Sequence, residues 1–287
     1  MDKSYIVSTI VENIPVAENT YKMRLTCPEI AQAFKPGQFC MLRVPGVHDP
    51  LLGRPLAIYD LWLDGRGNLA GIDVMYLVVG KATELFKDLR PGQLIEVWGP
   101  LGNGFSLENR AKHIILLAGG IGQTPMLTLA KEALGRVQYT DAPYFRREKV
   151  SLCYGAKSRA FFARLEDFHS LGLEMNLVTV DGSAPDGFPC SQGFATDPMR
   201  QIFESESAEN LYVYACGPKP MLIAAQKLLN QFNVQGQISL ETPMACGLGI
   251  CFTCVAKIQD EQGNWDYKRT CKEGPVFDAR KILWENG

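Results

Sequence analysis

The sequence has little net charge and no long run of one charge sign. Its 29 Lys and Arg residues stand against 31 Asp and Glu residues, which gives a formal charge of −2 and a pI near 6.0. A basic stretch with interleaved aromatic residues is absent. Because nucleic-acid binding depends on such a positive surface, we expect no nucleic-acid partner.

Long hydrophobic runs are absent as well. No apolar stretch approaches the ~20 residues that a membrane-spanning helix requires. The N-terminal residues MDKSYIVSTIVENIP lack the basic segment, apolar core and cleavage site of a secretory signal, and they alternate as a β-strand does. We therefore expect a cytoplasmic protein with no membrane partner.

Histidine is scarce, and the nine cysteines are an odd number. A disulfide framework would use an even number, so we expect a reducing compartment. The histidines share no motif and are interpreted as structural: His48, His113 and His169. Four dispersed cysteines are interpreted as buried small hydrophobic residues: Cys27, Cys40, Cys153 and Cys190.

Apart from Cys216, the remaining cysteines are concentrated in the stretch from Glu241 to Pro275. Cys246, Cys251 and Cys254 have C-x4-C-x2-C spacing. A fourth thiol, Cys271, follows a polar excursion that is typical of a β-hairpin. This is the ligand spacing of plant-type ferredoxins, which hold a [2Fe–2S] cluster through four thiolates. We predict that these four cysteines are its metal ligands.

Glycines inside the loop support this interpretation over two alternatives. Gly247 and Gly249 allow the positive φ angles with which a compact loop turns several sulfurs toward one point. A structural zinc site usually pairs two C-x2-C knuckles, and only one is present here. The second alternative is that the cysteines are buried hydrophobic residues.

The first hundred residues read as short β-strands separated by turn residues. We expect six strands, at Ile6–Ile14, Tyr21–Cys27, Gln38–Val44, Leu56–Leu63, Gly71–Val79 and Leu94–Trp98. Strands of this length and spacing are typical of an antiparallel barrel. One helix is expected at Ala82–Leu89, because Pro91-Gly92 follows its end.

Two features of this barrel predict a flavin site. Arg54 can bind phosphate through its planar fork, and it precedes a proline-stiffened strand that can lie along a flat ring. The helix start at Gly80 offers free N–H groups to a pyrophosphate. Taken alone, Arg54 is more often a surface cation. The candidate flavin-binding residues are Arg54, Pro55, Leu56, Ala57, Leu77, Val78, Val79, Gly80, Ala82 and Thr83.

Beyond the connector at residues 99–105, strands and helices alternate. We expect strands at His113–Ala118, Val150–Tyr154, Met175–Val180 and Asn210–Cys216, and helices at Met126–Leu134, Phe161–Leu171 and Pro218–Phe232. Alternating β and α units imply a parallel, doubly wound sheet. The polar, aperiodic segment 136–149 is interpreted as a surface insertion.

Two glycine-rich turns follow strands of this sheet. GGIGQTP at 119–125 joins a strand to a helix, which is the arrangement that cradles phosphate. CGPKPM at 216–221 follows another strand end. GGIG alone also occurs as a simple tight turn, and Cys216 is equally consistent with a buried thiol. The candidate nucleotide-binding residues are Gly119, Gly120, Gly122, Thr124, Pro125, Cys216, Gly217, Pro218 and Met221.

These patterns predict a multi-domain β plus α/β protein. We expect an FAD-binding antiparallel β-barrel at 1–106, an NAD-binding α/β domain with a doubly wound parallel sheet at 107–235, and a [2Fe–2S] module at 236–287. The preference for NAD or NADP stays open, because residues 157–159 are equally consistent with a 2′-phosphate site and with solvated cations.

The order of these parts resembles the electron-transfer subunits of class 1B dihydroorotate dehydrogenase, within the ferredoxin–NADP reductase superfamily. The matching pieces are RPLA at 54–57, GGIGQTP at 119–125, DGS at 181–183, CGPKPM at 216–221, MACGLGICFTC at 244–254 and CKEGPVF at 271–277. The superfamily commonly has Ser or Thr where this chain has Ala57, so a hydroxyl contact to flavin N5 is not expected.

The resemblance implies an oxidoreductase subunit that contains FAD and a [2Fe–2S] cluster and uses NAD⁺ as acceptor. It also implies a catalytic partner that carries FMN and oxidises dihydroorotate in pyrimidine biosynthesis, assembled as a heterotetramer. We expect no catalytic general base in this chain. Related subunits of ferredoxin transhydrogenases, sulfide dehydrogenases and hydrogenases are one alternative. A redox-sensing module without turnover is another.

Overall fold

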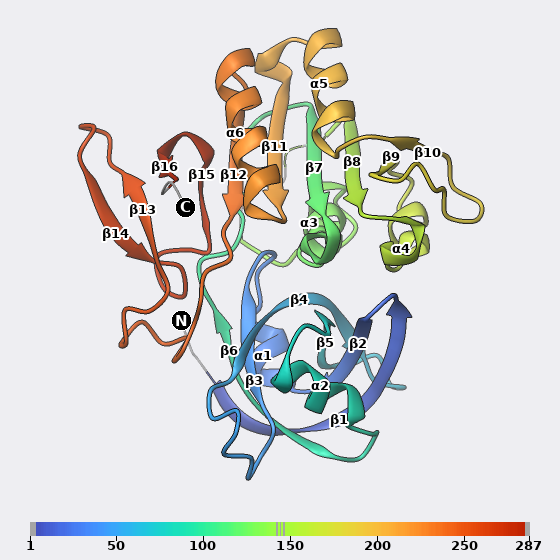
Figure 1. Ribbon diagram of the computed structural model, residues 1–287, viewed down its shortest axis with the longest axis vertical. Coiled ribbons are helices and arrows are strands. Elements are labelled where there is room, and N and C mark those ends of the chain that lie inside the picture. The colour runs from blue at the N-terminus through green and yellow to red at the C-terminus, as the bar shows by residue number, and fades with distance from the viewer. Residues whose placement is uncertain (1–3, 142, 144, 146, 285–287) are drawn as a thin grey trace.

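The computed structural model describes residues 4–141, 143, 145 and 147–284. A β-barrel forms the lower part of Figure 1, a helix-covered sheet forms the upper part, and a small β-sheet lies beside both. The predicted fold class is confirmed. Among the described residues, no helix combines the length and apolarity needed to cross a membrane.

The barrel closes in the strand order β1-β2-β5-β4-β3-β6, with neighbouring strands antiparallel. Its strands are β1 (Ser4–Ala17), β2 (Thr20–Thr26), β3 (Phe39–Arg43), β4 (Arg54–Leu63), β5 (Leu69–Leu77) and β6 (Leu94–Leu101). Helix α2 (Lys81–Asp88) lies where a helix was predicted. Helix α1 (Pro28–Ala33) was not predicted, because six residues are too few to show a helical period.

The second sheet has the order β10-β9-β8-β7-β11-β12-β15 and is parallel except for β15. Its strands are β7 (His113–Gly119), β8 (Lys149–Ala156), β9 (Glu174–Thr179), β10 (Cys190–Gln192), β11 (Leu211–Cys216), β12 (Gln235–Ser239) and β15 (Val276–Asp278). Its helices are α3 (Met126–Ala133), α4 (Leu165–His169), α5 (Thr196–Ser205) and α6 (Lys219–Phe232).

Helices cover both faces of this sheet, as doubly wound topology requires. Side chains of α3 and α4 pack into one buried cluster, and side chains of α5 and α6 pack into another. Helix α4 is shorter than predicted, because Arg164 has a left-handed backbone with φ of 55° that separates it from residues 159–161. Short 3-10 turns lie at Gly120–Gln123 (η1), Arg159–Phe161 (η2), Ala208–Asn210 (η3) and Ala279–Lys281 (η4).

The C-terminal part is joined to both larger parts. It contains a three-stranded sheet of β14 (Trp265–Arg269), β13 (Val255–Gln259) and β16 (Ile282–Leu283), and the β13–β14 hairpin was predicted. Strand β15 adds to the edge of the parallel sheet, where Phe277 lies opposite Ile238. Strand β12 begins at the second predicted domain boundary, and the two boundaries stay predictions.

Within the segment predicted to be a surface insertion, residues 142, 144 and 146 lie outside the described residues. Arg147 from the same segment is 8% exposed. It donates to the carbonyl oxygens of Ala111 at 2.7 Å and Leu107 at 2.8 Å. Arg147, near the end of this segment, therefore binds the backbone of residues 107–111, which lead into the parallel sheet.

Candidate cofactor sites

The two glycine-rich turns lie side by side at the point where the strand order reverses. They follow β7 and β11, which are adjacent, with Ala118 paired to Cys216. A Cβ atom on Gly122 would lie 2.3 Å from the carbonyl oxygen of Cys216, so the two turns are in backbone contact. Open α/β sheets bind ligands at the carboxyl ends of their strands at such a switch point.

The backbone at Gly120 faces open space. Its φ of 53° lies in the left-handed region, and a Cβ atom there would meet nothing within 4 Å. A dinucleotide phosphate fits this position, because it needs close approach to the backbone. Thr124 is buried instead, and its hydroxyl donates to the carbonyl of Ile121 at 2.7 Å, so this side chain closes the turn.

Cys216 is half-buried at the end of β11. Burial raises the pKa of its thiol to about 12, although a hydrogen bond with Ser239 acts in the opposite direction. The thiol is therefore protonated at neutral pH. At this position it offers a small neutral surface and no reactive thiolate.

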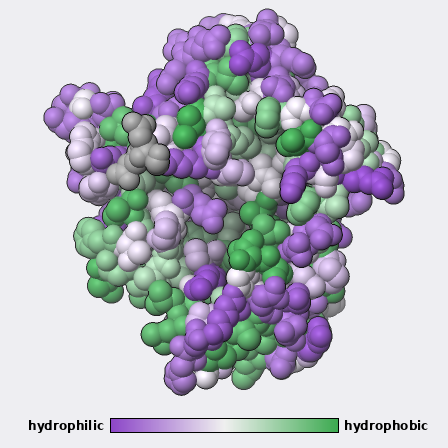
Figure 2. All heavy atoms as spheres, viewed as in Figure 1, coloured by the Kyte–Doolittle hydropathy of each residue, from purple (hydrophilic) through white to green (hydrophobic). Residues whose placement is uncertain are grey.

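In this closed barrel, the first residues of β4, which include the predicted flavin residues, are unpaired on the side that faces β5. From Arg54 to Ala57, β4 pairs with β3, whereas its pairing with β5 begins only at Ile58 and Val74. Residues 54–57 are half-buried, and Val79 beyond the end of β5 is 77% exposed. Figure 2 shows the surface hollowed between the barrel and the sheet above it. An extended strand edge beside a hollow fits a planar ring system.

The predicted phosphate-binding residues of this site differ in the hydrogen bonds that they already make within the protein. Arg54 donates to the carbonyl oxygens of Leu52 at 2.9 Å and Gly53 at 3.2 Å, and it has no carboxylate partner in the part of the chain that the structure describes. Thr83 Oγ1 accepts from the N–H groups of Val79 at 3.0 Å and Gly80 at 3.1 Å. Contrary to expectation, these two N–H groups are thus already satisfied.

The four predicted cluster ligands come together as two pairs. Burial and the neighbouring Cys254 thiol raise the pKa of Cys271 to about 12. Hydrogen bonds with Thr253 and Cys246 lower the pKa of Cys251 to about 6. Among the described residues, no three His, Cys, Asp or Glu side chains surround one point as a single metal ion requires. Two thiol pairs fit a cluster with two irons, each held by two thiolates.

The loop that presents these thiols has the backbone that a cluster requires. Gly247 and Gly249 have φ angles of 70° and 81°. The Leu248 N–H donates to the sulfur of Cys246 at 3.3 Å, which would offset thiolate charge. The Trp98 indole N–H donates to the Cys246 carbonyl at 3.0 Å and anchors the loop to the barrel.

Arg269 and Glu273 support the same loop and were not predicted. Arg269 donates to the Gly249 carbonyl at 2.7 Å and to Glu273 through Nε at 3.0 Å, and its guanidinium lies 4.7 Å from the Phe252 ring centre. Their positions two residues on either side of Cys271 are the sequence feature that could have identified them.

Comparison with known proteins assigns each part of the chain. Three family models match: an oxidoreductase FAD-binding domain at residues 8–105, an oxidoreductase NAD-binding domain at 116–227, and the iron-sulfur cluster binding domain of dihydroorotate dehydrogenase B at 241–283. The dihydroorotate dehydrogenase B (NAD(+)) electron transfer subunit of Desulforamulus reducens is 35% identical over 271 residues, 94% of this chain and 95% of the relative. The chain belongs to this family of electron transfer subunits.

Other members and a wider fold group agree with this assignment. The dihydroorotate dehydrogenase B electron transfer subunit of Fusobacterium nucleatum is 34% identical and covers 96% of each chain. A solved NADH-dependent reduced ferredoxin-NADP oxidoreductase shares the fold with a TM-score of 0.77 and 23% identity, over 97% of this chain and 90% of that chain. Phthalate dioxygenase reductase shares it with a TM-score of 0.59 and 19% identity, over 93% and 77%.

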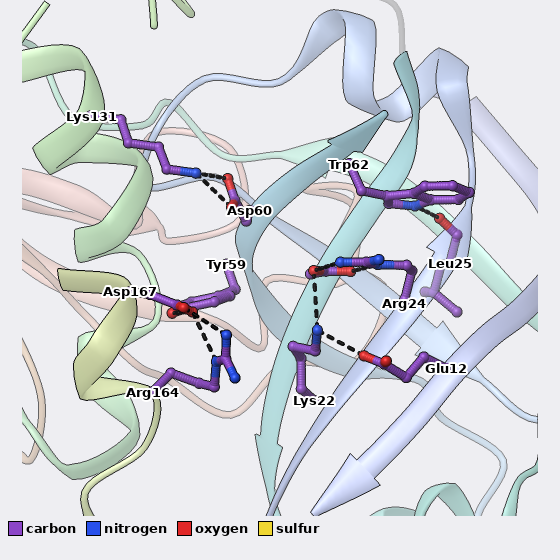
Figure 3. Close-up of polar contacts among 11 residues, drawn as sticks. Glu12, Lys22, Arg24, Leu25, Tyr59, Asp60, Trp62, Lys131, Arg164 and Asp167 are labelled. Atoms are coloured by element: carbon purple, nitrogen blue, oxygen red, sulfur yellow. Dashed lines mark hydrogen bonds and ion pairs between the residues drawn. The ribbon is translucent and has the colours of Figure 1, made fainter. Parts of the chain in front are cut away.

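Like its family, the chain therefore has domains for FAD, NAD and an iron-sulfur cluster. The assignment of individual residues to these cofactors stays a prediction, which the geometry above supports. A polar network between the barrel and the helices of the parallel sheet (Figure 3) was missed altogether. Its partners are 71 and 108 residues apart, and no local pattern links them.

Proposed function

We propose that this chain carries electrons between NAD(H) and an FMN-containing catalytic subunit that oxidises dihydroorotate, in a heterotetramer. In this proposal the glycine turns hold the nucleotide, β4 and α2 hold FAD, and the four cysteines hold the [2Fe–2S] cluster next to the partner. When bound, flavin exchanges hydride with nicotinamide and single electrons with an iron-sulfur cluster. The family assignment supports the reaction class, and the placement of β3 supports the proposed route.

A single strand separates the two predicted redox sites. Phe39 and Met41 of β3 pack in one buried cluster with Cys254 and Cys271. On its other side, Phe39 is paired with Ala57 in the predicted flavin strand. Neighbouring strands lie ~4.8 Å apart, so in this proposal the flavin strand and the cysteine cluster both border β3. This juxtaposition is the observation that carries the proposal.

The loop that bears the cysteines also offers a surface for the partner. Leu248, Ile250 and Phe252 are 41%, 75% and 60% exposed. Beside them, a groove of about 300 Å³ is lined by Cys246 and by Tyr5 and Trp98 of the barrel. Figure 2 shows hydrophobic side chains gathered at the left edge, where this loop lies in Figure 1. Exposed apolar side chains beside redox thiols favour a protein partner there.

Other residues of the chain bind, orient and exclude water, and none is required as a general base. Arg54 is assigned to the flavin phosphates, and the half-buried residues after it to one edge of the ring. The protonated Cys216 thiol would pack near the nicotinamide without reacting.

Co-expression with the catalytic subunit tests the proposal. Dihydroorotate-dependent reduction of NAD⁺ and the mass of a heterotetramer are expected, and a complex that reduces NAD⁺ only with other donors would overturn it.

Replacing Arg54 by Gln tests the flavin assignment. Loss of the guanidinium removes a charge-assisted phosphate contact, so we expect the FAD dissociation constant to rise about tenfold or more while iron content stays unchanged. Flavin released on gel filtration measures the effect. Arg66→Gln, in an exposed turn of the same barrel, is the control. Equal FAD retention in the two variants would contradict the assignment.

A further inference from the structure

Two polar contacts tie the predicted flavin strand to helices of the nucleotide domain. Lys131 Nζ of α3 donates to both carboxylate oxygens of Asp60 in β4, at 2.7 and 2.6 Å. Both side chains are about one-fifth exposed, at 22% and 21%. Figure 3 shows Lys131 extending from its helix toward Asp60 on the strand.

The second contact begins at the neighbouring residue, Tyr59. Its hydroxyl donates to Asp167 Oδ2 of α4 at 2.6 Å, and its side chain is almost fully buried. Burial and the adjacent carboxylate raise the pKa of Tyr59, so the hydroxyl keeps the proton that it donates. Arg164 holds the same carboxylate from the other side, at 2.9 and 2.6 Å (Figure 3).

The Asp60–Lys131 contact joins the two elements that carry the predicted cofactor sites, and the Tyr59–Asp167 contact ties the same strand to the neighbouring helix α4. Strand β4 begins with residues 54–57 and reaches Tyr59 and Asp60 two and three residues later without leaving the strand. The glycine turn, which consists of η1 followed by Thr124 and Pro125, leads directly into helix α3. Lys131 lies in the last turn of this helix. A shift of the Asp60–Lys131 contact would therefore move one predicted site relative to the other, and the Tyr59–Asp167 contact restrains the same part of β4.

We propose that Tyr59, Asp60 and Lys131 are positioning residues that set the spacing between the flavin and the nicotinamide. The proposal rests on the function proposed above. Hydride transfer requires reacting atoms about 3–3.5 Å apart, and a misplacement of ~1 Å costs on the order of a hundredfold in rate. A contact between two domains acts on this distance without touching either cofactor.

A purely stabilising role makes a different prediction. A partly exposed ion pair contributes little to the free energy of folding. The Asp60–Lys131 pair also borders a cavity of about 190 Å³, whose lining includes Arg24 and Asp73 of the barrel. If the contacts only stabilised the fold, their loss would lower the melting temperature and leave the transfer step of the folded protein unchanged.

The test uses the purified full-length protein with its flavin and cluster, under anaerobic conditions. The variants are Asp60→Asn, Lys131→Met and the double variant, with Tyr59→Phe as a further variant that removes one hydroxyl. Lys149→Met is the matched control, because the Lys149–Glu174 ion pair at 2.5 Å lies within the parallel sheet and at the ends of β8 and β9 remote from the glycine turns.

Three quantities are measured: the saturating rate at which NADH bleaches the flavin, the NADH concentration at half-saturation, and the flavin difference spectrum that NAD⁺ produces. We expect Asp60→Asn and Lys131→Met each to slow bleaching about tenfold and to weaken the difference spectrum. Half-saturation and FAD content should stay within twofold of wild type. The double variant should be no slower than either single one, because both remove the same contact.

Each outcome separates the two proposals. Contact variants that bleach as fast as Lys149→Met, or losses that multiply in the double variant, would overturn the positioning role alone. If Asp60→Asn does not fold, Tyr59→Phe decides by the same criteria. A wild-type protein that NADH does not bleach would overturn the proposed function and the positioning role together.

Discussion

Replacing Cys254 by Ser is expected to abolish electron transfer to the proposed catalytic subunit and to leave NADH able to bleach the flavin. A serine hydroxyl is a far weaker iron ligand than a thiolate, and Cys254 is only 1% exposed beside Cys271, so no other thiol can replace it. We expect a decrease of at least ~1,000-fold in NADH-dependent reduction of the partner, since the relay is lost. Iron content and partner reduction, measured in the same preparation, report the effect.

The control for this experiment is the same substitution in another buried thiol. Cys153 lies in β8, is fully buried, and burial raises the pKa of its thiol to about 12. Cys153→Ser is expected to keep its iron and its partner reduction, even if it melts at a lower temperature. Full iron content and normal partner reduction in Cys254→Ser would show that this thiol is not a cluster ligand.

Replacing Gly122 by Ala is expected to impair the use of NADH strongly. A Cβ atom there would lie 2.3 Å from the Cys216 carbonyl oxygen and 2.7 Å from Gly217 Cα, and backbone atoms cannot move aside as the end of a flexible side chain can. The two turns would have to move apart, which would distort both halves of the predicted nucleotide site. We expect kcat/KM for NADH to fall on the order of a hundredfold, with FAD and iron unchanged.

A glycine in an open position controls for the added methyl group. At Gly65 a Cβ atom would meet nothing within 4 Å, and the residue lies in an exposed turn of the barrel. Gly65→Ala should oxidise NADH at the wild-type rate. A Gly122→Ala protein that binds and oxidises NADH normally would place the nucleotide away from these turns.

The parts of the fold that were predictable have strong local patterns. Continuous apolar residues from His113 identified β7, and the Gly263 turn identified the hairpin of β13 and β14. Strand β12 was missed because its sequence, QGQIS, is mostly polar and contains a glycine, which removes the apolar pattern of a buried strand. Its burial results from pairing with β11 on one side and β15 on the other.

The candidate sites were predictable where their ligands lie close together in the sequence. The cysteine loop and the glycine turns are of this kind. The contact between Asp60 and Lys131 is formed only when two domains pack, and either residue alone resembles a surface charge. Thr83 was assigned to a ligand, yet its hydroxyl binds backbone N–H groups three and four residues earlier. Competition between local capping and ligand binding depends on coordinates that a sequence does not contain.

We propose that electrons pass between the nucleotide and the cysteine module through the flavin. The most direct test of this path is an EPR spectrum of the anaerobic, iron-loaded protein after NADH is added, recorded together with the visible spectrum. We expect flavin bleaching together with a rhombic signal of a reduced [2Fe–2S] cluster. A bleached flavin without any cluster signal would contradict this proposal, because the cysteine module would then lie outside the electron path.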